Sequence, residues 1–203
     1  QSVQEAHDIA LCAHIASLRA SLPFVHFFDG FRTSHETCNI RVIDEESLKQ
    51  FVPWEAVQRH RDRAINPNHP NLRGTAQSPD IYMQLVEAAN PTYASVPEIV
   101  DKVFEEMAPV FGRRYRLFEY YGAEDAEDVI VCMGSGANVV HETVNYLNAR
   151  GSKVGVLKVR LFRPWSVKHF LEVLPKTVKR VAVLDRCKDP GAQGEPLFLD
   201  TCT

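Results

Sequence analysis

The sequence has no clustered cysteines. Its five cysteines are dispersed over 203 residues, and no two of them have the Cys-x-x-Cys spacing. Metal and iron–sulfur ligands stand close together in sequence because one ion or cluster must touch them all. None of the eight histidines pairs at i, i+4 with another histidine or a carboxylate. We therefore predict no metal site, and reduced thiols in an intracellular protein.

An excess of one charge and long apolar runs are also absent. The formal net charge is −3 at pH 7, which gives no bulk attraction for nucleic acid or an anionic membrane. No apolar run approaches the roughly 18 residues of a membrane helix, and no signal or transit peptide is recognisable. We predict no nucleic-acid or membrane partner. The predicted location is cytoplasmic, or mitochondrial or hydrogenosomal in a eukaryote.

The chain lacks an initial methionine and begins with Gln. Ser2 and Glu5 form a capping box, which predicts a helix over residues 3–20. Its small-residue face consists of Val3, Ala6, Ala10, Ala13 and Ser17. Residues 24–28 are predicted to form a strand. Because one helix and one strand cannot bury themselves, we interpret residues 1–40 as the end of another α/β domain, and the chain as a piece of a longer one.

Residues 41–114 are predicted to be helices joined by loops. Asp44 caps a short helix, and Pro53 allows a second helix over residues 54–65. The stretch "NPNHPNLRGTAQSP" is a long loop, and such loops often reach across an interface. Ser78-Pro79 then begins a helix that Asn90-Pro91 ends.

A second capping box consists of Ser95 and Glu98. It predicts the start of the next helix. The apolar side of that helix consists of Ile99, Val103, Met107 and Val110.

From residue 115 on, strand and helix patterns alternate. The stretches "YRLFEYYG", "DVIVCMGSG", "KVGVLKV" and "RVAVLD" have the pattern of strands. Between them, "ANVVHETVNYLNARG" and "SVKHFLEVL" have that of helices, and Gly151 ends the first. Such alternation is typical of a parallel sheet covered on both faces. The sequence thus predicts an α/β fold, with a Rossmann-like parallel-sheet domain over 115–203 that follows a helical and loop linker over 41–114.

The turn "MGSGAN" follows one predicted strand and opens a helix. Gly134, Ser135 and Gly136 make it a candidate anion-binding turn, since backbone N–H groups at a helix N-terminus can hold an anion. The dinucleotide fingerprint requires a third glycine, where this chain has Val139. We favour the alternative of a tight turn without a ligand.

Polar side chains gather in "PFVHFFDGFRTSHE", residues 23–36. Asp29, Ser34, His35 and Glu36 suggest a nucleophilic triad, but a triad must converge from a rigid frame, and neighbours on one loop point apart. The Gly-x-Ser-x-Gly elbow is missing. We therefore predict no catalytic residue here, and a polar loop at the carboxyl end of a strand, where α/β folds bind ligands.

Two cationic segments remain open to two interpretations. Arg73-Gly74-Thr75 in the long loop could hold an anion through its guanidinium and backbone N–H groups, or be a surface turn. Lys158, Arg160 and Arg163 flank "LFRPW", where they could bind a ligand or form a solvated strand end.

Long motifs resemble those of pyruvate:ferredoxin (flavodoxin) oxidoreductases, which are thiamine-dependent 2-oxoacid oxidoreductases. "PFVHFFDGFRTSHE" is similar to the end of that family's first domain. "NLRGTAQSPDIYMQ" resembles its next hallmark, where the family usually shows Arg-Gly-Thr-Ala-Gln-Asn-Pro-Asp. "VIVCMGSGANVVHETVNYLNARGSKVGVLKVRLFRPW" and "LPKTVKRVAVLDRCKDPGAQGEPLFLD" resemble its second domain, which is similar to the C-terminal domain of transketolase-type enzymes. The resemblance covers nearly the whole chain.

The resemblance implies a multidomain, homodimeric parent enzyme. Such an enzyme converts pyruvate and coenzyme A to acetyl-CoA and CO₂ with thiamine diphosphate, magnesium and iron–sulfur clusters. It passes electrons to ferredoxin or flavodoxin, or to NADP through a fused flavoprotein. The family's activating glutamate, pyruvate-binding arginine, magnesium motif and cluster cysteines have no counterpart here. We therefore expect this chain to hold no cofactor, to be inactive alone, and to have the remaining domains of the parent as its partners.

The resemblance also gives the polar loops a role at a domain interface close to the cofactor. The candidate residues are Asp29, Arg32, Ser34, His35, Glu36, Arg73 and Thr75. One rival hypothesis is a similar region in the flavoprotein subunit of some fungal sulfite reductases, an electron-transfer scaffold without thiamine chemistry. The motifs "GFRTSHE" and "RGTAQ" favour the pyruvate enzyme. Against the second rival, a free-standing interaction module, stand the missing methionine and the half-domain over residues 1–40.

Overall fold

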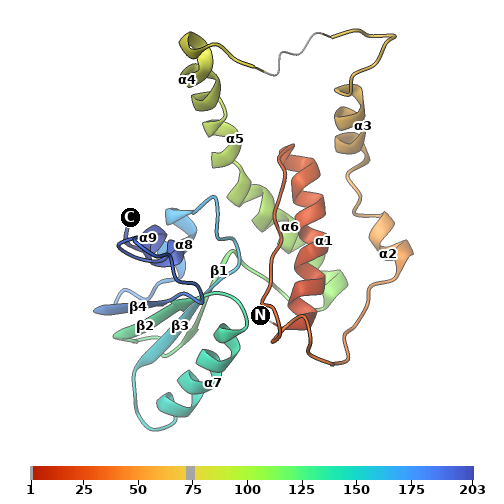
Figure 1. Ribbon diagram of the computed structural model, residues 1–203. Coiled ribbons are helices and arrows are strands. Elements are labelled where there is room, and N and C mark those ends of the chain that lie inside the picture. The colour runs from red at the N-terminus through yellow and green to blue at the C-terminus, as the bar shows by residue number, and fades with distance from the viewer. Residues whose placement is uncertain (1, 72–75) are drawn as a thin grey trace.

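The computed structural model describes residues 2–71 and 76–203. Figure 1 shows a sheet with helices on both sides, a helical pair beside it, and smaller helices that extend away from the sheet. The predicted candidates Arg73 and Thr75 lie outside the described residues. Within the described ranges, no helix combines the length and the apolar character needed to cross a membrane.

Helix α1 (Val3–Ala20) begins at the predicted capping box, which is confirmed: the Ser2 hydroxyl accepts from the Glu5 amide, and the Glu5 carboxylate accepts from the Ser2 amide. Its predicted packing face is wrong. The buried residues are Asp8, Cys12, Ile15, Ala16 and Ala20, whereas Val3, Ala6, Ala10, Ala13 and Ser17 are only half-buried. Burial of Cys12 and Ile15 removes more apolar area from water than burial of the alanines and Ser17 of the predicted face could.

The predicted strand over residues 24–28 is wrong. This segment is extended, and its side chains alternate between half-buried Phe24 and His26 and exposed Val25 and Phe27. Its backbone, however, pairs with no strand among the described residues. A segment counts as a strand only when its backbone is hydrogen-bonded to a neighbouring strand. The alternation of half-buried and exposed residues over 24–28 therefore occurs here without a sheet.

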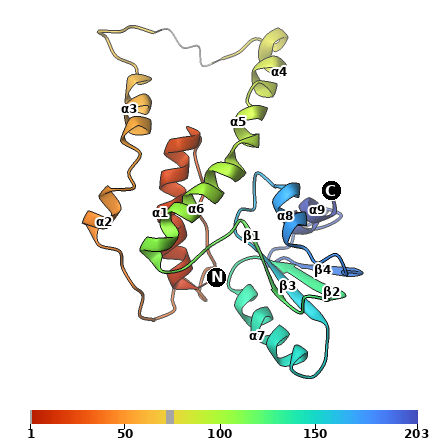
Figure 2. The ribbon, with the colours of Figure 1, turned by 180° about the vertical axis from the view of Figure 1, so that it is seen from behind.

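The arm comprises α2 (Glu45–Lys49), α3 (Trp54–Asp62), α4 (Pro79–Glu87) and α5 (Asn90–Ala94). Both ribbon views place α3 and α4 far from the sheet (Figures 1 and 2). The Asp44 cap is confirmed by its bond from the Ser47 amide at 2.8 Å. Asn90-Pro91 opens the short helix α5, although it was predicted only to end a helix. The prolines at N1 or N2 of α4 and α5 suit a first turn, because its amides have no intrahelical partner.

Helix α6 (Val96–Phe111) has no capping box at Ser95, contrary to the prediction. The Ser95 hydroxyl instead donates to the Thr92 carbonyl at 2.8 Å. Because α5 leads directly into α6, Ser95 has helical dihedrals and cannot adopt the extended conformation of an N-cap. Of the predicted apolar side, Val103 and Met107 are buried, and the other two residues are half-buried.

The described residues form four strands, β1 (Phe118–Gly122), β2 (Asp128–Cys132), β3 (Val154–Val159) and β4 (Arg180–Leu184), in the order β1-β3-β2-β4. Strand β2 is parallel to both β3 and β4, as predicted, but β1 is antiparallel to β3. The sheet is therefore mixed. A parallel pair needs a long crossover, and the few residues between β1 and β2 are too short for one, so these two strands run in opposite directions.

Helices cover both faces of this sheet. Helix α7 (Gly136–Asn148) packs on one face, while α8 (Val167–Val173) and α9 (Pro196–Cys202) lie on the other side (Figure 1). One core cluster continues from Cys12 of α1 through Met107 of α6 to Phe118 and Leu157 of the sheet. The N-terminal helix and the sheet are thus parts of a common core.

Candidate functional site

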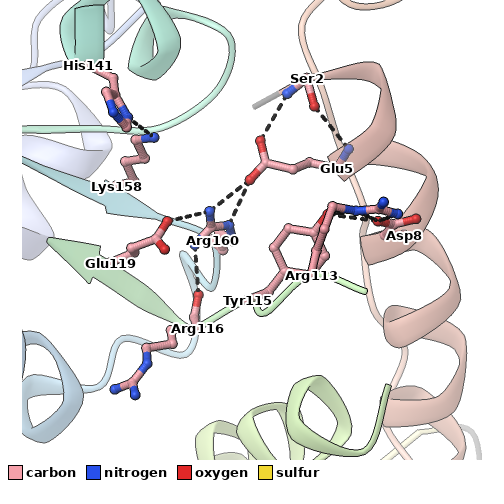
Figure 3. Close-up of polar contacts among 10 residues, drawn as sticks. All are labelled: Ser2, Glu5, Asp8, Arg113, Tyr115, Arg116, Glu119, His141, Lys158 and Arg160. Carbon is pink, nitrogen blue, oxygen red and sulfur yellow. Dashed lines mark hydrogen bonds and ion pairs between the residues drawn. The ribbon is translucent and has the colours of Figure 1, made fainter. Parts of the chain in front are cut away.

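Arg160, directly after β3, joins α1 to the sheet through two carboxylates. Its side chain is only 5% exposed. Its guanidinium donates to Glu5 at 2.8 and 3.1 Å and to Glu119 of β1 at 2.7 Å (Figure 3). Burial raises the pKa of Glu5, but Arg160 and further contacts that include the Ser2 amide together hold the pKa of this carboxyl below its usual value. Arg160 is therefore part of a buried ion-pair network and not of a solvated strand end.

Like Glu5, Asp8 forms a tie, that is, a contact between a carboxylate of residues 1–40 and a distant arginine. This second tie joins α1 to the segment before the sheet. Its side chain is 0% exposed, and one carboxylate oxygen accepts from Arg113 and from the Tyr115 hydroxyl, each at 2.7 Å (Figure 3). Gln4 donates to the other oxygen at 2.9 Å. Burial opposes ionisation of Asp8, yet these donors together with His7 lower its pKa below the usual value.

Asp29 supplies the third tie, on the glycine turn after β2. Its carboxylate accepts from the Ser135 amide and pairs with Arg186 at 2.7 Å. Arg186 also donates to the Ser135 hydroxyl at 3.0 Å. Burial raises the pKa of Asp29, but the Ser135 and Arg186 contacts lower it overall. The predicted anion-binding turn does hold an anionic group, namely the Asp29 carboxylate of the same polypeptide.

Gly134 makes room for this carboxylate. A Cβ atom on Gly134 would stand 2.8 Å from the Asp29 Oδ2 atom, closer than real Cβ contacts come. Its φ of 78° is also unfavourable for other residues. The turn thus fits Asp29, and a bound diphosphate would compete with Asp29 for the Ser135 amide.

The rest of the polar loop is a compact turn on the surface. Ser34 Oγ lies 2.7 Å from His35 Nδ1, so these neighbours do converge, contrary to the expectation that they point apart. The Asp29 carboxylate, however, faces Ser135 and Arg186, and no carboxylate contact of His35 is found among the described residues. Arg32 and Glu36 are exposed. The loop thus presents a Ser–His pair without an orienting carboxylate.

Lys158 of β3 points toward α7, where its ammonium lies 2.7 Å from His141 Nδ1 (Figure 3). Burial and the Lys158 charge lower the pKa of His141, so the ring accepts from the ammonium in its neutral form. Tyr121 stacks on this ring at 3.6 Å and donates to Asn145 at 2.8 Å. These contacts hold α7 on the sheet.

A cavity of about 690 Å³ lies between α1, α6, residues 22–29 and the carboxyl ends of the parallel strands. Its lining is mainly apolar and includes Phe24, Phe28, Phe104 and Phe162. Crevices at the carboxyl ends of parallel strands are where α/β folds bind ligands or neighbouring domains. Within residues 2–71 and 76–203, no group of three His, Cys, Asp or Glu side chains is arranged to hold a metal ion.

Two family models match the chain. Residues 1–105 match "Pyruvate flavodoxin/ferredoxin oxidoreductase, thiamine diP-bdg", and residues 126–202 match "Pyruvate:ferredoxin oxidoreductase core domain II". The chain belongs to the pyruvate:ferredoxin/flavodoxin oxidoreductase family. The resemblance predicted from the motifs is thereby confirmed.

Relatives of this family are similar over the whole chain. The chain is 60% identical over 202 residues to a pyruvate:ferredoxin oxidoreductase from Moorella thermoacetica. The alignment covers 100% of this chain and 17% of that protein. It is 55% identical over 199 residues to a mitochondrial pyruvate dehydrogenase [NADP(+)] from Euglena gracilis, covering 98% of this chain and 11% of that protein. The chain thus spans less than a fifth of these relatives.

A solved structure is similar to a smaller part of the chain. It is 2-oxoglutarate:ferredoxin oxidoreductase from Magnetococcus marinus, with 2-oxoglutarate, coenzyme A and succinyl-CoA bound. The two chains are 25% identical, and the match covers 56% of this chain and 16% of that one with a TM-score of 0.40.

In this family member, the ties depend on residues that the sequence patterns did not single out. Glu5 was assigned only to a helix cap, and Asp8, Arg113, Glu119 and Arg186 were not considered. One signal was available: Asp8, Cys12, Ile15 and Ala20 follow a helical period, which places a carboxylate within an otherwise apolar stripe. No local signal identifies Arg113 and Arg186, because their carboxylate partners Asp8 and Asp29 are more than 100 residues away.

Replacement of Gly134 by Ala tests the third tie. We expect a loss of about 1–3 kcal/mol in the free energy of unfolding, since the new Cβ meets Asp29 and the φ is positive. The loss should shrink by at least ~0.5 kcal/mol when Asp29 is replaced by Ala as well. Urea unfolding of the purified chain measures both. Gly136→Ala is the control, because open space surrounds Gly136; equal losses at both glycines would contradict the tie.

Acid should lower the stability that the Glu5, Asp8 and Asp29 contacts give to the folded chain. The folded pKa values of Glu5, Asp8 and Asp29 all lie below their usual values, so these groups bind fewer protons in the folded than in the unfolded chain. Their stabilisation is therefore present above the unfolded pKa of about 4 and is lost as the pH falls through the folded values. Urea midpoints from pH 7 to pH 3 should show this fall, and Asp8→Asn should make it shallower. A midpoint independent of pH would contradict it.

Proposed function

We propose that this chain is the joint between the first and second domains of a thiamine-dependent pyruvate oxidoreductase. The parent converts pyruvate and coenzyme A to acetyl-CoA and CO₂, and passes the electrons to ferredoxin or flavodoxin, or to NADP through a fused flavoprotein. The observation that carries the proposal is the identity of 52–60% to several proteins whose names state pyruvate oxidation with these acceptors. The relatives reported above carry the names of pyruvate enzymes, which favours this proposal over the rival hypothesis of a sulfite reductase scaffold.

Within that enzyme, residues 1–40 would end the pyrimidine-type thiamine diphosphate domain and residues 115–203 would form the transketolase C-terminal-like domain. Residues 41–114 would link them. Three carboxylates of the first segment, Glu5, Asp8 and Asp29, each pair with an arginine from beyond residue 112. These pairs support the assignment of an interface, because each one fixes the position of the N-terminal segment relative to the sheet.

The chemistry of the cofactors would come from the rest of the parent. Thiamine diphosphate supplies the electron sink for decarboxylation when it is bound. The glycine turn does not fit its diphosphate, because the Asp29 carboxylate already lies on the Ser135 amide. We propose that Arg32, Ser34, His35 and Glu36 lie close to the cofactor and anchor domain contacts. Arg73 and Thr75 are proposed for the same role from the sequence motif alone.

Pyruvate turnover of the full-length parent tests the proposal. We expect coenzyme A-dependent reduction of ferredoxin or flavodoxin with pyruvate as the substrate. The purified 203-residue chain should release no CO₂ from pyruvate, and its calorimetric titration with thiamine diphosphate and magnesium should give only the heat of dilution. Saturable micromolar binding to the chain alone would mean that it contains the cofactor site.

Replacement of Ser34 by Ala in the parent separates an anchoring role from nucleophilic catalysis. Removal of a catalytic nucleophile costs on the order of 10⁶ in kcat. Because no carboxylate of the described residues orients the Ser34–His35 pair, we expect kcat to stay within about tenfold of the unmodified enzyme. Steady-state kinetics with pyruvate measure this, and a loss beyond ~10⁴-fold would assign Ser34 to the chemistry.

A further inference from the structure

Helix α4 is apolar over more of its circumference than the described part of the chain can cover. Its apolar side chains are Ile81, Tyr82, Met83, Leu85 and Val86. Each is between 45% and 72% exposed, and α4 has no buried residue. At about 100° per residue these five positions span an arc of about 200°, and the polar residues occupy the remainder. A surface helix needs an apolar stripe only about half as wide.

The helix is held out from the body by its C-terminal connection. It continues through α5 into α6, and both ribbon views show α4 beyond α5, remote from the sheet (Figures 1 and 2). Helix α6 in turn is anchored by its buried face in the common core. This mounting presents α4 in a defined direction, which lowers the entropy lost when a partner binds.

We propose that α4 inserts into an apolar groove formed by the remaining polypeptide of the same parent chain. The chain spans 17% of the length of a 60%-identical relative, so most of the polypeptide lies outside this structure. An arc of about 200° requires a groove with two walls, because a single facing helix covers one stripe. Two copies of α4 packed around a two-fold axis would leave half of the arc exposed. The larger part of the parent chain is therefore the better occupant.

The polar side of α4 defines the opening of the groove. Asp80, Gln84 and Glu87 lie on the narrow polar arc, where they would face water or the rim of the groove. Glu87 already accepts from Asn90 at 2.8 Å. The groove must therefore be apolar on both walls and open on one side. This interface rests on the chain being part of a longer enzyme and does not depend on the reaction that the enzyme catalyses.

Amide hydrogen exchange in the full-length parent tests the proposal without turnover. An isolated nine-residue helix is marginal in water, so an uncovered α4 would exchange nearly as fast as an unfolded peptide. We expect the α4 amides to exchange at least ~100-fold more slowly than that. Met83→Asp should speed their exchange by at least tenfold, while Gln84→Asp, the adjacent change on the polar arc, should not. Unprotected α4 amides in the unmodified parent would overturn the inference.

Photocross-linking identifies the occupant. A benzophenone side chain in place of Met83 should join α4 to a peptide outside residues 1–203, and the product should migrate as a single chain on a denaturing gel. The same group in place of Gln84 should cross-link weakly. A product of doubled mass would assign the contact to a second copy and overturn the proposal, as would the absence of any product at position 83. Either failure would leave the proposed function standing, because neither readout involves pyruvate.

Discussion

Arg160→Met should lower the free energy of unfolding of the chain by about 3–5 kcal/mol. Loss of one partner of a buried ion pair costs this much because it leaves uncompensated charge behind. Here two carboxylates, Glu5 and Glu119, would lose their common cation, and Glu5 is the more buried of the two. The apolar methionine would preserve most of the volume. Urea unfolding, followed by circular dichroism, measures the change.

Arg163→Met is the matched control. Arg163 lies three residues further along and pairs with Asp200 at 2.8 Å, but its side chain is 60% exposed. Surface pairs contribute about 0–1 kcal/mol. Adding Glu5→Gln and Glu119→Gln to Arg160→Met should restore part of the loss, since no carboxylate then remains unpaired. Similar losses for Arg160→Met and Arg163→Met would show that the buried pair does not hold α1 on the sheet.

Asp8→Asn should cost about 3 kcal/mol. The amide cannot match the charge of Arg113, and its NH₂ group would face donors where a carboxylate oxygen now accepts. Tyr115→Phe removes only one donor and should cost about 1.5–3 kcal/mol, the range for a hydrogen bond to a charged group. The double variant should lose less than the sum, because both changes act on one network.

The control for Asp8 is Asp62→Asn at the end of α3. Asp62 accepts from Gln58 at 2.7 Å, but both side chains are exposed. A change there should remain within about 0.5 kcal/mol. If Asp8→Asn is as mild as Asp62→Asn, the buried network does not contribute to stability.

Local patterns predicted those elements that local forces specify. The capping box at Ser2 and the Asp44 cap need only neighbouring residues, and both formed as expected. The four strands of the second half follow from short apolar runs between turn residues. The glycine turn at Gly134 likewise follows from the strand and helix on either side of it.

Long-range partners decide what the patterns missed. The extended residues 24–28 have a strand pattern, but a ladder requires a second strand that the described residues do not provide. The direction of β1 depends on the length of its connection to β2 and on its pairing with β3. The three carboxylate ties join residues that only the folded chain brings together. For the candidate site, the sequence identified Asp29 and the turn separately, and the contact between them required the structure.

The distance along the chain between the tied residues affects how the protein can fold during synthesis. Asp8 and Arg113 are 105 residues apart, and Glu5 and Arg160 are 155 apart. At roughly 5–20 residues per second, a ribosome exposes α1 on the order of 10 s before Arg160 emerges. Helix α6, which packs on the buried stripe of α1, and Arg113, the cation of Asp8, emerge before Arg160, so Glu5 is the carboxylate of α1 that waits longest for its cation. Docking of α1 would therefore occur in two stages, first on α6 and Arg113 and then, after β3 has been synthesised, on Arg160.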